Sequence, residues 1–71
     1  MDSTQQVKGV IRKVKGGYGF IAGYDGKDYF MHWTAMQKGN DFRKLTVGDR
    51  VEFQPIESER GPRAVEVLVV G

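Results

Sequence analysis

Short stretches of alternating apolar and polar residues, separated by glycine-containing turns, make up most of this chain. A period of two is typical of β-strands with one buried face, and β-branched and aromatic residues favour the same state. The pattern predicts strands over Gln6–Val14, Tyr18–Tyr24, Asp28–Trp33, Arg50–Glu57 and Arg63–Val70. Residues 34–47 show no sustained alternation, so we expect a long connection there with one helical turn near Thr34–Gln37.

The alternation in the second and third predicted strands divides their side chains between two faces. One face carries four flat side chains, those of Tyr18, Phe20, Phe30 and His32. Ile21 and Met31 have the opposite parity, which suits the core. The Asp25-Gly26 pair predicts a tight hairpin between the strands, so the four flat side chains form one platform. Gly19, between two aromatic residues, is expected to let another flat group approach the sheet.

The first predicted strand has no purely apolar side. Strict alternation places Arg12 and Val14 on one side, and Ile11 and Lys13 on the other. We therefore expect a bulge in this strand or a basic, partly exposed face.

The last two predicted strands are more apolar. Val51 and Phe53 are expected to face inward, and Pro55 indicates a strand edge or a bulge. In the final strand the apolar residues Val65, Val67 and Val69 alternate with Glu66 and Leu68.

Five short strands in so few residues favour a closed barrel, because closure removes the exposed edges of a flat sheet. We expect an all-β, five-stranded antiparallel OB-fold barrel with Greek-key connections. An SH3-like barrel is the alternative architecture. The predicted domain covers residues 6–70, and residues 1–5 are predicted to be a disordered tail.

Composition narrows the range of functions. The chain has 71 residues, no cysteine and one histidine, which predicts a single domain without a disulfide, a metal site or a small-molecule cofactor. It offers no arrangement of nucleophile and base, so we expect no enzymatic activity. The longest aliphatic run, Val67–Val70, falls far short of the roughly 20 residues of a membrane helix. With no signal-like N-terminus, we expect a cytoplasmic protein with no membrane partner.

Positive charge is concentrated in the first part of the chain. Residues 1–44 carry eight Lys and Arg against four Asp, a net of +4, whereas residues 45–71 carry three Arg against five acids, a net of −2. This asymmetry favours a polyanionic partner. Flat side chains bordered by cations suit single-stranded nucleic acid, because bases stack on aromatic rings while Lys and Arg neutralise phosphates.

Four runs of the sequence resemble the cold-shock domain family. They are Gly17–Ile21, Asp28–Trp33, Gly48–Phe53 and Arg60–Ala64, within a resemblance that covers about residues 7–70. The resemblance implies an OB-type barrel that binds single-stranded RNA or DNA. It also identifies the first two runs as the ribonucleoprotein motifs, and implies a nucleic-acid chaperone.

Site residues follow from the same resemblance. It assigns base stacking to the four platform residues, with Trp33 beside them and Phe42 as a further position. It assigns ligand contacts to Arg12 and Arg60, and a hydrogen bond with a base to Asp28. With the neighbouring cations, the candidate nucleic-acid-binding residues are Arg12, Lys13, Lys15, Tyr18, Phe20, Asp28, Phe30, His32, Trp33, Phe42, Arg60 and Arg63.

The chain departs from the family pattern in its first strand. Lys13 and Val14 stand where most bacterial members have a stacking tryptophan and a second aromatic residue, so positive charge replaces one end of the platform. A different function remains open, in which an SH3-like barrel binds a Pro-rich peptide on its aromatic face. The sequence also leaves open whether the barrel is a monomer or exchanges strands to form a dimer.

Overall fold

The computed structural model describes residues 6–37 and 41–70. Its elements are β1 (Val7–Lys15), β2 (Tyr18–Gly23), β3 (Asp28–His32), the 3₁₀ turns η1 (Trp33–Ala35) and η2 (Phe42–Lys44), β4 (Arg50–Ser58) and β5 (Gly61–Val69). Each predicted strand is confirmed, with its ends within two residues of those expected. The predicted tail, residues 1–5, lies outside the described residues. No helix in the described part of the chain has the length and apolar character to cross a membrane.

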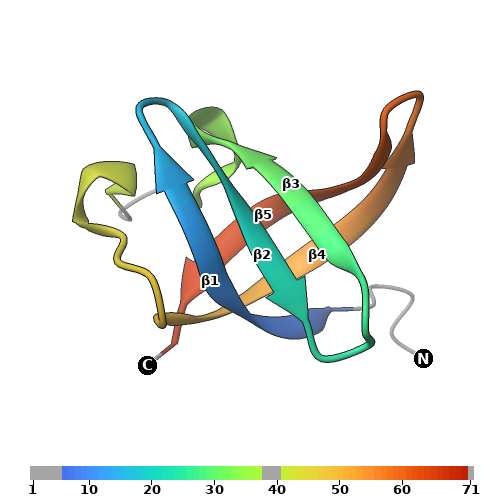
Figure 1. Cartoon of the computed structure of the whole chain (residues 1–71), viewed down its shortest axis with the longest axis horizontal. Coiled ribbons are helices and arrows are strands. Elements are labelled where there is room, and N and C mark those ends of the chain that lie inside the picture. The colour runs from blue at the N-terminus through green and yellow to red at the C-terminus, as the bar shows by residue number, and fades with distance from the viewer. Residues whose placement is uncertain (1–5, 38–40, 71) are drawn as a thin grey trace.

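The strands close into a barrel in the order β1-β2-β3-β5-β4. In Figure 1, β1, β2 and β3 lie side by side in front, and β4 and β5 cross behind them. Neighbouring strands are antiparallel except β3 and β5, which are parallel at Phe30 and Arg63. A ring with an odd number of strands cannot alternate direction at every joint, so one parallel pair is unavoidable. The all-β OB-fold barrel is therefore confirmed, with this parallel joint added.

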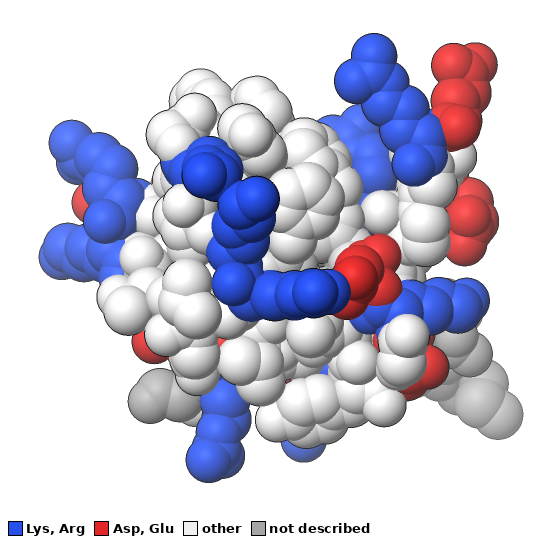
Figure 2. Space-filling view, viewed as in Figure 1, with Lys and Arg blue, Asp and Glu red and all other residues white. Residues whose placement is uncertain are grey.

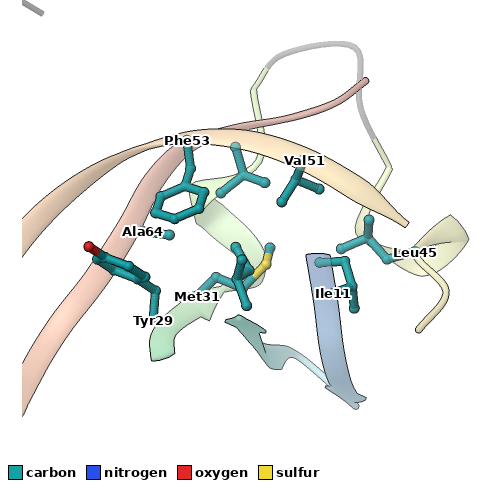
Figure 3. Close-up of a cluster of buried hydrophobic side chains, with 9 residues drawn as sticks. Ile11, Tyr29, Met31, Leu45, Val51, Phe53 and Ala64 are labelled. Atoms are coloured by element: carbon teal, nitrogen blue, oxygen red, sulfur yellow. The ribbon is translucent and has the colours of Figure 1, made fainter. Parts of the chain in front are cut away.

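The barrel encloses a small apolar core, drawn in Figure 3. Its buried residues are Ile11, Ile21, Tyr29, Met31, Leu45, Val51, Phe53, Ala64 and Val67. The inward orientation predicted for Ile21, Met31, Val51 and Phe53 is confirmed. Because these residues fill the interior, the flat side chains of opposite parity on β2 and β3 remain on the outside.

A bulge in β1 changes which of its side chains face outward. Ile11 pairs with Ile21, but the next pair joins Lys13 to Phe20, so Arg12 is an additional residue in β1. The bulge reverses the alternation after Ile11. The expected bulge is therefore confirmed: Lys13 is exposed and lies on the same face as Phe20, whereas strict alternation would have placed it on the side of Ile11.

A second bulge interrupts the alternation of β5. The pairing with β4 shifts between Glu52 and Gln54, and Glu66 has a φ of 54°. As a result Ala64 and Val67 are the buried residues of β5, whereas Val65 is only half-buried. The regular alternation expected in β5 is thus broken at Glu66. This residue is the additional one of the bulge, so the residues that precede it face the opposite side from the one that strict alternation predicts.

Gly19 has a structural role that differs from the expected one. A Cβ atom built at Gly19 would lie 2.6 Å from the carbonyl oxygen of Lys13. The absent side chain therefore allows the backbones of β1 and β2 to approach each other next to the bulge, and the expectation that it admits a ligand group is wrong.

The β2–β3 hairpin is fixed by a side-chain hydrogen bond as well as by its turn. Gly26 has a φ of 87°, as glycine readily adopts. The hydroxyl of Tyr29 donates to the carboxylate of Asp25 over 2.5 Å. This hydrogen bond, with burial adding to it, raises the pKa of Tyr29 to about 12, and the same bond lowers the pKa of Asp25. Because Tyr29 is a core residue, its hydrogen bond with Asp25 anchors the β2–β3 hairpin, which carries the flat side chains, to the core.

Candidate nucleic-acid interface

Two rows of side chains cross the outer face of the barrel. The first row runs across β1, β2, β3 and β5 through Lys13, Phe20, Phe30 and Arg63. The second runs across β1, β2 and β3 through Lys15, Tyr18 and His32. Residues directly opposite each other on neighbouring strands share a face. The aromatic platform, defined as Tyr18, Phe20, Phe30 and His32, is therefore bordered by cations on β1 and β5.

Three rings of the platform touch one another. The ring centroids of Tyr18 and Phe30 are 5.8 Å apart and the rings are stacked, whereas Phe20 meets Phe30 edge-on at 5.7 Å. Tyr18 and Phe20 are 6.1 Å apart, also edge-on. None of the three is fully buried, and Tyr18 is 38% exposed. The group forms a continuous, partly exposed aromatic surface on which flat groups can stack.

His32 and Trp33 extend this surface at the end of β3. The Nδ1 atom of His32 accepts a hydrogen bond from the backbone N–H of Thr34 at 3.4 Å and lies 2.9 Å from the Thr34 hydroxyl. Trp33, 55% exposed, lies 5.9 Å from His32 between ring centroids. β3 ends at His32, so the alternation that would have turned Trp33 inward does not apply to it.

Arg12 and Asp28 form an ion pair beside the platform. The Arg12 guanidinium donates to the Asp28 carboxylate over 2.7 Å, and both side chains are more than half exposed. Together with Lys13 and Phe20 they line a shallow hollow. An exposed pair of this kind contributes little to stability and can exchange partners with a ligand.

A larger groove lies between the platform and the β4–β5 hairpin, which extends past β3 at the upper right of Figure 1. It has a volume of about 530 Å³ and is lined by Phe20, Phe30, Ser58, Glu59, Arg60, Pro62 and Arg63. Arg60 occupies the turn of the hairpin, and the Arg63 guanidinium lies over the Phe30 ring, 5.8 Å from its centroid. Ser58, Glu59 and Pro62 were not among the predicted site residues; Ser58 and Glu59 are marked in the sequence only by their place in the loop before β5, and Pro62 also by its place in the run Arg60–Ala64.

Phe42 is not among the ring contacts of the platform. It begins η2, where the Asp41 carboxylate accepts from the backbone N–H of Arg43, and its side chain packs partly against the core. The stacking role expected for Phe42 stays a prediction.

Charge is distributed unevenly over the face that contains β1, β2 and β3. Figure 2 shows Lys and Arg side chains around and across a largely uncharged central surface, with the acidic side chains mostly at its periphery. A surface of this kind attracts anions while leaving apolar groups accessible for contact.

The fold and this surface define a class, that of OB-fold barrels with an exposed aromatic face. The model of the "'Cold-shock' DNA-binding domain" family matches residues 7–70. The chain belongs to this family, and its function is nucleic-acid binding. The family is one of nucleic-acid binders rather than of enzymes.

Curated relatives agree with this assignment. The chain is 46% identical over 52 residues to "Cold shock protein 1" of Lactiplantibacillus plantarum, covering 73% of this chain and 77% of that protein. It is 46% identical over 55 residues to "Cold shock-like protein CspB" of Yersinia pestis, covering 76% and 77%. It is 45% identical over 56 residues to "Cold shock-like protein" of Thermotoga maritima, covering 79% and 83%.

A solved structure supports the fold independently. The structure "drosophila Unr CSD456" superposes with a TM-score of 0.79 at 22% identity, covering 97% of this chain and 28% of that chain. At this identity the similarity concerns the fold alone. Of the two architectures that the sequence left open, the OB-fold and the SH3-like barrel, this similarity supports the OB-fold.

Proposed function

We propose that this protein binds single-stranded RNA or DNA by stacking successive bases on the aromatic platform, with low sequence specificity. The observation that carries the proposal is the row through Lys13, Phe20, Phe30 and Arg63, in which cations border two rings on one outer face. Stacking is available to every base, whereas the exposed cations Lys13 and Lys15 contact the phosphates. Duplexes are excluded because their bases are already stacked on one another.

The same chemistry supports a role as a nucleic-acid chaperone in the cytoplasm. A base stacked on Phe20 cannot stack in a hairpin, so binding shifts the equilibrium toward the open strand without nucleotide hydrolysis. A fluorescently labelled RNA hairpin checks this consequence: the protein should lower its melting temperature, and Phe20→Ala should restore most of the original value. An unchanged melting temperature with saturating wild-type protein would refute the chaperone role.

A fluorescence titration tests binding itself. Trp33 is the single tryptophan of the chain and lies beside His32. Addition of a thymidine heptamer or an RNA heptamer should change its emission and saturate, whereas the matching duplex should bind much more weakly. If neither single strand gives a saturable signal nor a complex in a mobility assay, the proposed function is wrong.

Two pairs of variants separate stacking from charge. Phe20→Ala should weaken binding by about 1–3 kcal/mol at every salt concentration, and Tyr24→Ala is the matched control because Tyr24 is an exposed aromatic residue outside the platform. With about three to five phosphate contacts, the log–log salt slope of the wild type should be about −2 to −3.5. Lys15→Ala should flatten this slope more than Lys8→Ala, since Lys8 lies opposite Glu52 on the β4 side.

A further inference from the structure

Arg63 occupies the point where the platform meets the groove. It pairs with Phe30 across β3 and β5, and its Cζ atom lies 5.8 Å from the Phe30 ring centroid. The side chain also lines the groove of about 530 Å³ that continues toward Arg60 and Pro62. A base that stacks on this face of Phe30 would therefore displace the guanidinium from above the ring toward the edge of the base.

The Arg63 guanidinium has unused hydrogen-bonding capacity. Its Nε atom is buried and has no hydrogen-bond partner among the described residues. Two other guanidinium groups, those of Arg12 and Arg43, donate to the carboxylates of Asp28 and Asp41. Since this Nε makes no hydrogen bond with the described residues, no bond of that atom has to break when the guanidinium turns toward acceptors of a ligand in the groove.

The surroundings of Arg63 favour the edge of a base over a phosphate. Arg63 is half-buried in the groove, whereas Arg60 at the hairpin turn is exposed. The carboxylate of Glu59 lines the same groove and would repel a phosphate there. Phosphates of a stacked strand also lie on the solvent side of its bases, where exposed cations can reach them more easily.

The geometry of a guanidinium selects among the bases. Guanine presents two adjacent acceptors, O6 and N7, which match the two parallel donors of an arginine. Adenine places a donor beside N7, cytosine presents a donor at N4, and thymine or uracil presents one acceptor at O4. On the Hoogsteen edge only guanine satisfies both donors, whereas cytosine offers the acceptor pair O2 and N3 on its Watson–Crick edge, so the cytosine strand is the critical competitor.

We infer that Arg63 makes the position above Phe30 selective for guanine, through hydrogen bonds from its guanidinium to O6 and N7 of the stacked base. This inference rests on the proposed function, since it requires a base on Phe30. It adds a preference at one position to binding that is otherwise tolerant of sequence.

The inference is tested with thymidine heptamers that carry guanine, adenine, cytosine or 7-deazaguanine at the central position. The wild type should bind the guanine strand about five- to a hundredfold more tightly than the all-thymidine strand. 7-Deazaguanine lacks the N7 acceptor and should lose most of this gain. The ratio of affinities, rather than the affinity itself, is the measured quantity.

Variants identify the residue responsible. Arg63→Gln should lower affinity for each strand and bring the guanine-to-thymidine ratio close to one, since it lacks the guanidinium. Arg60→Gln is the matched control: it should weaken all strands by a similar factor and keep the ratio. A thermal unfolding curve for each variant shows whether the barrel is folded.

The outcomes separate the two proposals. Equal binding of guanine and thymidine strands by the wild type, an unchanged ratio in Arg63→Gln, or undiminished binding of 7-deazaguanine would overturn the guanine preference while leaving base stacking intact. Failure of every heptamer to bind would overturn the proposed function and this inference together.

Discussion

His32 is positioned by the turn that follows it. Its Nδ1 atom accepts from the backbone N–H of Thr34, so it serves as the N-cap of η1. The contacts of Nδ1 with Thr34 fix the orientation of the ring. The orientation of His32, a platform residue, therefore depends on Thr34, which lies outside the platform.

Tyr29 and Asp25 give the hairpin below the platform a dependence on pH. The pKa of Asp25 is lowered in the folded state by the hydrogen bond from Tyr29, so this contribution to stability exists above the unfolded value of 3.8 and is lost as the pH falls below it. The pKa of Tyr29 is raised to about 12 from 10.0, so the contribution is complete below pH 10.0 and declines as the pH rises toward 12.

Tyr29→Phe should remove both dependences. The variant should be less stable than the wild type at neutral pH, because the Asp25 carboxylate loses its hydroxyl donor. The difference in unfolding free energy should shrink in acid and again in strong alkali. Urea unfolding of both proteins across the pH range measures this. A difference that is the same at acidic, neutral and alkaline pH would contradict the role given to this bond.

At the scale of elements, the bulge in β1 brings positive charge to the platform. Without the additional residue at Arg12, Lys13 would have the parity of Ile11 and point inward. With it, Lys13 and Lys15 lie opposite Phe20 and Tyr18. Gly19, paired with Val14 next to the bulge, allows the two backbones to come close.

Gly19→Ala should therefore strain the contact between β1 and β2. Its Cβ would lie 2.6 Å from the Lys13 carbonyl oxygen, a backbone atom that cannot turn away. We expect a loss of about 1–3 kcal/mol in unfolding free energy, typical of overpacking. Gly16→Ala is the matched control, because its Cβ would meet nothing within 4 Å. Equal stability of the two variants in urea unfolding would contradict this view of the bulge.

The alternation of residues predicted the arrangement of β2 and β3 well. A period of two was enough to place Ile21 and Met31 in the core and the platform residues outside. In β1 the lack of an apolar side indicated a bulge but not its position at Arg12, and in β5 the alternation gave no sign of the bulge at Glu66, because the position of a bulge depends on how two strands pair. The contacts of Arg63 could not be predicted for the same reason, since they require the parallel joint between β3 and β5.

At the scale of the whole molecule, the barrel is a support for one open surface. Its interior is filled by the apolar core, so the candidate nucleic-acid-binding residues project outward from β1, β2, β3 and the β4–β5 hairpin. The net charge of +2 is small, yet the rows place Lys13, Lys15 and Arg63 directly beside the rings. We therefore expect stacking to provide most of the affinity and charge to supplement it.

One comparison tests that claim most directly: the affinities of a thymidine heptamer and an abasic heptamer of the same length and charge, measured at one salt concentration. If three bases stack at about 1–3 kcal/mol each, the abasic strand should bind more than about a hundredfold more weakly. Equal affinity for the two strands would show that the protein binds the backbone alone, and would contradict the role of the aromatic platform.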